Sequence, residues 1–124
     1  MAPFHVAIAN QDACTVVSVI GELDIASAPQ LEEQLSVAEA AGNSSLIVDL
    51  NRLDFIDSTG LSSLVRSSKR MEQAGVSFAL VCQPDRIEVH RVLEILGFDE
   101  VFKIFATLTA AGCEELSGES VEPS

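Results

Sequence analysis

Short apolar runs typical of strands alternate along the chain with apolar residues at helical spacing. Two strand-like runs come first, over residues 4–9 and 13–20. The turn-forming trio Asn10-Gln11-Asp12 lies between them and predicts an antiparallel hairpin. Three further strands are predicted over residues 45–50, 76–82 and 101–106.

Helices are predicted between these strands, because apolar side chains recur there every three to four residues. The first helix starts with the capping-box pattern Ser27-Ala28-Pro29-Gln30 and ends at Gly42. The second ends at the turn around Gly75. The apolar stripe of the first helix comprises Leu31, Leu35 and Ala38, and that of the second comprises Leu61, Leu64, Val65, Ser68 and Met71.

A third helix is predicted from the Asp-x-x-Glu start at Asp85 to Gly97. A fourth is predicted over residues 107–116, although Gly112 lies within it. The resulting order, β-β-α-β-α-β-α-β-α, predicts an α/β fold with a mixed, mostly parallel sheet, an N-terminal antiparallel strand and about four helices.

Acidic residues follow several of the predicted strands. The carboxyl ends of parallel strands share one edge of a sheet, so the loops after Ile20, Leu50 and Cys82 are expected to be neighbours. The acidic side chains expected along this edge are Glu22, Asp24, Asp54, Asp57 and Asp85.

The length and the net charge of the chain indicate its domain organisation and exclude several kinds of binding partner. The chain has 124 residues, 48% of them hydrophobic, with a net charge of −12. We expect one domain over residues 1–116 and a flexible acidic tail over residues 117–124. The negative charge and the absence of Trp and Tyr argue against binding nucleic acid or an anionic membrane surface. Residues 1–13 resemble neither a signal peptide nor a membrane span, which predicts a cytoplasmic protein.

The three cysteines, Cys14, Cys82 and Cys113, share no metal-ligand or C-x-x-C spacing. An odd number of cysteines in a protein expected to be cytoplasmic favours reduced thiols. They are predicted to be small buried apolar residues. No metal ion and no cofactor are expected.

The segment from Asn51 to Leu61 is expected to leave a strand, cross a short loop and start the second predicted helix, with Asp57 and Ser58 at the helix start. In the simplest interpretation Ser58 is the N-cap of that helix, and the helix dipole favours Asp57. A serine hydrolase would need G-x-S-x-G, but Ile56 stands at the first glycine position. An aspartic protease motif would have one residue fewer before Gly60, and a phosphate-binding P-loop would need a lysine close by, whereas the next lysine is Lys69. A general acid–base pair of surface carboxylates has no further support.

Over most of its length, the chain resembles the STAS domain of bacterial anti-sigma factor antagonists. Gly21-Glu22-Leu23-Asp24 is similar to the family's G-E-L-D, and the nine residues from Leu53 to Leu61 resemble its L-x-F-[IM]-D-S-[ST]-G-L phosphorylation segment. Leu96-Gly97-Phe98 followed by Val101-Phe102 resembles a closing element of the family. The resemblance extends from about residue 4 to residue 116.

This resemblance implies a regulatory protein that is not itself an enzyme. Ser58 would be phosphorylated by an anti-sigma factor that is a serine kinase and dephosphorylated by a serine phosphatase, with Thr59 as a secondary acceptor. The unphosphorylated form, a monomer or weak dimer, would capture the kinase and release its sigma factor. The expected partner surface comprises Glu22, Asp24, Asp57, Ser58, Thr59, Gly60 and Leu61. An alternative is a STAS scaffold subunit of a stress-sensing or transport assembly.

Overall fold

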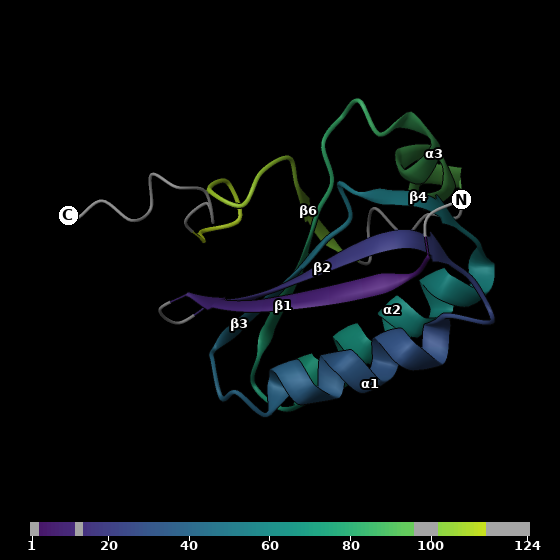
Figure 1. The fold of residues 1–124 in the computed structure, drawn as a ribbon. Helices are drawn as coiled ribbons and strands as arrows, with labels where there is room; N and C mark the ends of the chain where they lie inside the picture. The colour runs from purple at the N-terminus through teal and green to yellow at the C-terminus, as the bar shows by residue number, and fades with distance from the viewer. Residues whose placement is uncertain (1–2, 12–13, 96–101, 114–124) are drawn as a thin grey trace.

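Strands and helices alternate along most of the chain (Figure 1). The computed structural model describes residues 3–11, 14–95 and 102–113. Its strands are β1 (His5–Gln11), β2 (Cys14–Leu23), β3 (Ser45–Asp49), β4 (Leu53–Ile56), β5 (Ser77–Val81) and β6 (Lys103–Phe105). The helices of the described residues are α1 (Ala28–Glu39), α2 (Ser58–Gln73) and α3 (Ile87–Ile95).

The sheet is mixed and mostly parallel. Its strands follow the order β1-β2-β3-β5-β6, and β4 pairs with β2 away from this path. β1 is antiparallel to β2, whereas the pairs β2–β3, β2–β4, β3–β5 and β5–β6 are parallel. The predicted α/β fold with an N-terminal antiparallel strand is therefore confirmed.

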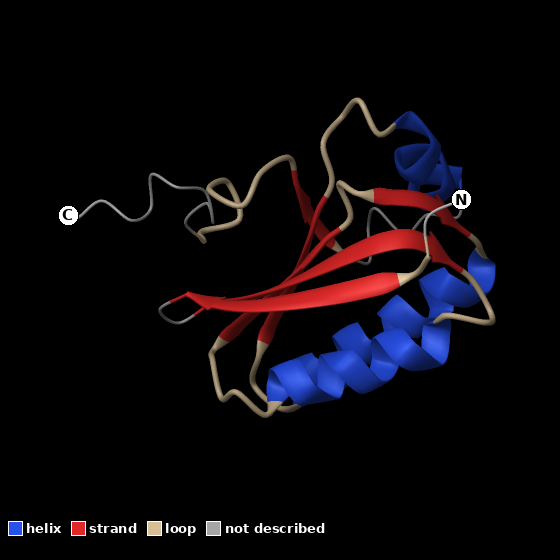
Figure 2. Cartoon of the chain, viewed as in Figure 1, coloured by secondary structure: helices blue, strands red, loops and turns tan. Residues whose placement is uncertain are grey.

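Each face of the sheet has its own apolar core. α1 and α2 lie side by side on one face (Figure 2), and Leu108 and Cys113 of the turns after β6 pack on the other. Leu46 and Val48 of β3 pack in the main core with the helices, while Ile47 between them packs in the second core on the opposite face. This alternation follows from the two-residue period of a strand, and both faces are covered in the middle of the sheet.

The apolar stripes predicted for the first two helices are confirmed. Leu31, Leu35 and Ala38 of α1 are buried, as are Leu61, Leu64, Ser68 and Met71 of α2. Between the two helices, Arg66 Nη2 donates a hydrogen bond to Glu32 Oε2 at 2.6 Å. This hydrogen bond holds the pKa of the Glu32 carboxyl below its usual value.

β4 was not predicted from the sequence, which suggested a loop between β3 and α2. In the structure, β2 continues past Ile20 to Leu23, and its register with β4 shifts between Gly21 and Glu22. β4 is four residues long and alternates little, so its pairing with the extension of β2 decides its conformation. The order of the described elements is therefore β-β-α-β-β-α-β-α-β.

The predicted fourth helix is wrong for residues 107–113. These residues form consecutive turns. Ala111 N donates to Thr107 O at 3.2 Å, and Cys113 N closes the turn on Leu108 O at 2.9 Å. Gly112 has a φ of +89°, a left-handed conformation that ends a helical turn instead of continuing it. Residues 114–116, the predicted tail over residues 117–124 and Gly97, the predicted end of the third helix, lie outside the described residues.

The prediction of reduced cysteines is wrong for Cys14 and Cys113 and is confirmed for Cys82. Cys14 and Cys113 form a disulfide across 99 residues of sequence, and their Cα atoms are 6.1 Å apart. Cys82 is a free, buried thiol, and burial raises its pKa to about 11. The burial predicted for all three is confirmed. The spacing of the cysteines along the chain could not predict this disulfide, because β2 and the turns after β6 meet only in the folded protein.

No helix within the part of the chain that the structure describes is both long enough and apolar enough to span a bilayer.

Candidate functional site

The carboxyl ends of β2 and β4 lie next to each other and carry two acidic residues. The parallel register pairs Glu22 with Phe55 and Leu23 with Ile56. Asp24 and Asp57 therefore each follow the last residue of neighbouring strands. The Asp57 amide also donates to the Leu23 carbonyl oxygen at 3.2 Å, which ties the two strand ends together.

Asp57, not Ser58, is the N-cap of α2. Its backbone is extended, with φ −112° and ψ −177°, and its Oδ1 accepts a hydrogen bond from the Gly60 amide at 2.9 Å. This is the side-chain bond that stabilises a helix start. The simplest interpretation of the sequence, in which Ser58 caps the helix, is therefore corrected.

Ser58 is the first residue of α2 and is exposed. Since Asp57 supplies the cap, the Ser58 hydroxyl is not needed to start the helix. Thr59 beside it is partly buried. The structure thus presents one hydroxyl to solvent at the positive end of the longest described helix, where an added anion is electrostatically favoured.

Gly60 and Leu61 follow in the first turn of α2 and are buried. A Cβ atom on Gly60 would stand 2.7 Å from the Leu23 carbonyl oxygen and 2.8 Å from Leu23 Cγ. Glycine therefore allows the start of α2 to pack directly on the end of β2. Among the predicted site residues, these two position the helix start, whereas the others are at least partly accessible.

The loop after β2 is held by hydrogen bonds around Asp24. Asp24 Oδ1 accepts from the amides of Ala26 and Ser27, at 3.0 and 3.2 Å. Ser27 Oγ accepts from the Asp24 amide at 2.9 Å and donates to the Glu22 carbonyl oxygen at 2.7 Å. Ser27 is the N-cap of α1 by position but makes no side-chain cap bond, so the predicted capping box with Gln30 is wrong.

The acidic residues expected along one edge separate into two groups. Glu22 and Asp24 line a hollow of about 280 Å³ together with Phe4 and Gln30. Asp54 and Asp85 line a different hollow, of about 360 Å³ beside α3. Arg86 from this second hollow donates to the Leu53 carbonyl oxygen and lies 4.0 Å from Asp54 Oδ1. Asp54 and Asp85 therefore lie apart from the hollow that Glu22 and Asp24 line.

Two exposed apolar side chains adjoin this site and were missed from the sequence. Ile25, directly after Asp24, is 73% exposed, and Phe55, in β4, is 47% exposed. Phe55 also lines a groove of about 700 Å³ with Ile87 and Val92 of α3. Large apolar side chains exposed beside a polar site are typical of protein-binding surfaces. The signal available in the sequence was that neither residue fits the predicted apolar stripes.

The cap assigned to Asp57 can be tested by substitution. Asp57→Ala is expected to lower the free energy of unfolding by about 1 kcal/mol, because the Gly60 amide loses its acceptor. Asp57→Asn keeps an oxygen at this place and is the matched control. Urea unfolding of the two variants checks this, and an equal stability of Asp57→Ala and Asp57→Asn would contradict the assignment.

No group of three or more His, Cys, Asp or Glu side chains in residues 3–11, 14–95 and 102–113 is arranged to hold a metal ion.

The family model of the STAS domain matches residues 5–111, which is most of the chain. The chain belongs to the STAS domain family.

Curated relatives of this STAS domain protein are anti-sigma factor antagonists. The chain is 31% identical over 103 residues to the anti-sigma-F factor antagonist RsfB of Mycobacterium tuberculosis, covering 83% of this chain and 82% of the relative. It is 33% identical over 95 residues to an anti-sigma-B factor antagonist of Staphylococcus aureus, covering 77% and 86%.

Solved structures show the same fold. An anti-sigma factor antagonist from Mycobacterium paratuberculosis superimposes with a TM-score of 0.78 at 28% identity, over 88% of this chain and 91% of that one. The homologues of this chain are thus regulators that act on anti-sigma factors.

Proposed function

We propose that this protein is an anti-sigma factor antagonist controlled by phosphorylation of Ser58. Unphosphorylated, it binds an anti-sigma factor that is also a serine kinase, and the sigma factor is released. The kinase transfers phosphate to Ser58, which ends the binding, and a serine phosphatase restores the free hydroxyl. The protein is the substrate of both enzymes, acts in the cytoplasm and is a monomer or weak dimer when alone.

The observation that carries this proposal is the exposed Ser58 hydroxyl at the start of a helix that another residue caps. A kinase can reach this hydroxyl without unfolding the helix. Phosphorylation adds a charge of about −1.5 to −2, and the amides and dipole of a helix start favour such a charge by roughly 0.3–1 kcal/mol. The fold is therefore expected to tolerate the phosphate.

Binding of a partner to the surface around Ser58 is expected to tolerate the phosphate much less well than the fold does. Asp24, Asp57 and Glu22 already make it acidic, and Ile25 and Phe55 add exposed apolar area beside them. A partner that covers this area must desolvate whatever it covers, and an additional anion raises that cost and repels acidic groups of the partner. The names of the homologues, antagonists of anti-sigma factors, supply the class of partner.

A series of Ser58 variants tests the proposal. Candidate anti-sigma factor kinases from the same genome are incubated with the protein and ATP, and fragment mass spectrometry locates the phosphate. Ser58→Ala is expected to bind the kinase but to lose most of the phosphate that the wild type takes up. Ser58→Asp is expected to bind roughly 100-fold more weakly by calorimetry, since juxtaposed like charges cost several kcal/mol. Thr59→Ala is the neighbouring control and should still be phosphorylated at Ser58.

Asp24→Asn separates charge from loop structure. An alanine at Asp24 would also remove the acceptor for the Ala26 and Ser27 amides, whereas asparagine keeps an oxygen there. Weaker kinase binding by Asp24→Asn with an unchanged thermal melt is the expected result. Incorporation of phosphate into Ser58→Ala at the wild-type rate, or unimpaired binding by Ser58→Asp, would contradict the proposal. Elution of the isolated protein as a large oligomer would instead favour the scaffold alternative.

A further inference from the structure

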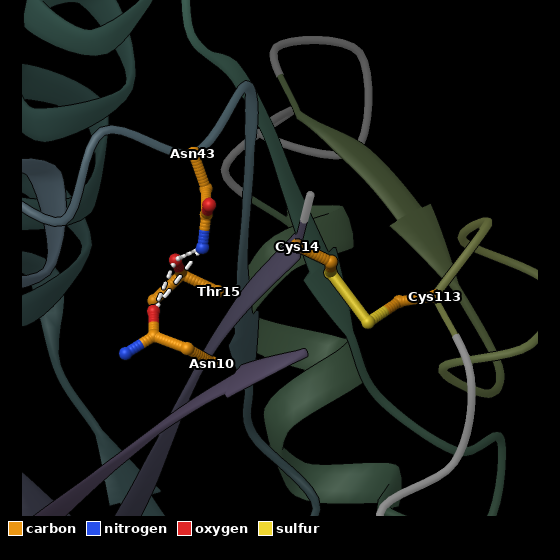
Figure 3. The surroundings of a disulfide bond; sticks show 5 residues. All are labelled: Asn10, Cys14, Thr15, Asn43 and Cys113. Atoms are coloured by element: carbon orange, nitrogen blue, oxygen red, sulfur yellow. Dashed lines mark hydrogen bonds between the residues drawn. A yellow bond between two sulfur atoms is a disulfide. The ribbon is translucent and has the colours of Figure 1, made fainter. Parts of the chain in front are cut away.

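A disulfide ties the start of β2 to the turns that follow β6. Cys14 is the first residue of β2, and Cys113 ends the C-terminal segment, by which we mean residues 107–113 (Figure 3). Their Cα atoms are 6.1 Å apart, within the range that a disulfide spans. The bond lies on the outer face of the sheet, the face opposite α1 and α2.

The C-terminal segment covers the second apolar core. Leu108 and Cys113 are buried there against strand residues that share the outer face. These strand residues are Val16 of β2, Ile47 of β3 and Ala79 and Val81 of β5. The backbone hydrogen bonds of Ala111 and Cys113 close within the segment, onto Thr107 and Leu108, so they do not hold it on the sheet. Leu108, Cys113 and the partly buried Ala111 pack the segment against this core, and the disulfide fixes it covalently.

The two cysteines are held very differently. On the side of Cys14, Asn43 Nδ2 donates to Thr15 Oγ1 at 2.7 Å, and Thr15 Oγ1 donates to Asn10 Oδ1 at 2.9 Å (Figure 3). These bonds fasten the start of β2 to β1 and to the loop before β3, and none of them involves sulfur. Cutting the disulfide would therefore leave Cys14 in place but would remove the covalent tie between Cys113 and the sheet.

We propose that Cys14 and Cys113 form a reversible thiol–disulfide site, which exchanges with low-molecular-weight disulfides and controls whether the C-terminal segment stays docked on the outer face of the sheet. In the disulfide state the segment covers the second core. In the dithiol state it detaches and exposes Val16, Ile47, Ala79 and Val81. No part of this depends on Ser58.

A small disulfide is the oxidant in this exchange, which proceeds in two steps. One cysteine thiolate attacks the small disulfide, a mixed disulfide forms, and one small thiolate leaves. The second cysteine thiolate then attacks the protein sulfur of that mixed disulfide and expels the other small thiol. Two electrons pass from the protein to the small disulfide, and the two protons from the cysteines end on the two small thiols. Reduction of the protein disulfide follows the same two steps in reverse.

Cys82 is unsuited to this chemistry. It lies in the main core on the other side of the sheet and is 1% exposed. Exchange requires a thiolate, and burial keeps this thiol protonated at neutral pH by raising its pKa to about 11. Cys82 therefore serves as an internal control.

The redox site is also far from Ser58. β2 runs ten residues from Cys14 to Leu23, roughly 30 Å at the usual rise of an extended strand, and Ser58 lies near the far end. A change at the disulfide should leave the start of α2 unaltered, so failure of this inference would not affect the proposed function.

The test measures the redox state and the docking of the segment together. The full chain is equilibrated in glutathione buffers from fully reduced to fully oxidised, quenched in acid, and alkylated after denaturation, and labelled cysteines are located by mass spectrometry. We expect all three cysteines to be labelled in the reduced buffer and Cys82 alone in the oxidised one. In hydrogen exchange, peptides spanning residues 107–113 are expected to exchange at least tenfold faster in the reduced protein, and peptides from the start of α2 to exchange equally.

Two variants complete the design. Cys113→Ala is expected to show fast exchange of the segment in every buffer, whereas Cys82→Ala should respond to glutathione as the wild type does. Chemical reduction of the wild type gives the same information if Cys113→Ala folds poorly. The inference is overturned if all three cysteines remain labelled in the oxidised buffer, if Cys82 enters the disulfide, or if the segment exchanges equally in both redox states.

Discussion

Reduction of the Cys14–Cys113 disulfide is expected to lower the free energy of unfolding by roughly 3–5 kcal/mol. The bond closes a loop with a sequence separation of 99, and the chain-entropy estimate for a loop of about 100 residues is about 4.7 kcal/mol. The bond acts mainly on the unfolded state, because joining Cys14 to Cys113 greatly restricts the conformations of the loop between them. Urea unfolding in the presence and absence of a reductant measures the difference.

A Cys14→Ala/Cys113→Ala double variant is the control for this prediction. Reductant should not shift its unfolding midpoint, because its remaining thiol, Cys82, is free. Equal midpoints of the oxidised and reduced wild type would show that the bond contributes no stability.

The second large effect is expected for Gly60→Ala, with a loss of about 1–3 kcal/mol of stability. In an exposed helix, alanine in place of glycine stabilises by roughly 0.5–1 kcal/mol, so the expected sign is the reverse of the usual one. The reason is steric: the new Cβ would lie 2.7 Å from the Leu23 carbonyl oxygen, a backbone atom that cannot rotate away. α2 must shift or β2 must bend.

Ser62→Ala is the matched substitution on the same helix. Ser62 is exposed, and its replacement should change stability by less than about 0.5 kcal/mol. Thermal and urea unfolding of the two variants decide the matter. If Gly60→Ala is as stable as Ser62→Ala, close packing of α2 on Leu23 is not what requires glycine.

The effect of Gly60→Ala also bears on the Ser58 site. Gly60 lies two residues after Ser58, and its contact with Leu23 fixes the start of α2 beside the loop of Asp24. A shift of this helix would move the hydroxyl relative to Asp24 and Asp57. Any loss of kinase binding in Gly60→Ala therefore reports on position, whereas a loss in Asp24→Asn reports on charge.

Local patterns were enough to predict most elements of the fold. The stripe of Leu31, Leu35 and Ala38 reflects the helical period of 3.6 residues, and β5 is a short continuous apolar run. Both signals depend on near neighbours alone. The turn residues Gly42 and Gly75 marked where helices end for the same reason. The segment from Asp57 to Leu61 could likewise be singled out, because its residues are contiguous.

By itself, the sequence determined the α/β class of the fold, the faces of α1 and α2 that are buried and the hydroxyl at the start of α2. Tertiary structure alone decided that Asp57 is the cap, that β4 pairs with β2, that Asp24 lies with Asp57 while Asp54 lies with Arg86, and that Cys14 meets Cys113. The difference is physical: periodicity and turn chemistry act over a few residues, whereas these contacts join residues that only the packed sheet brings together.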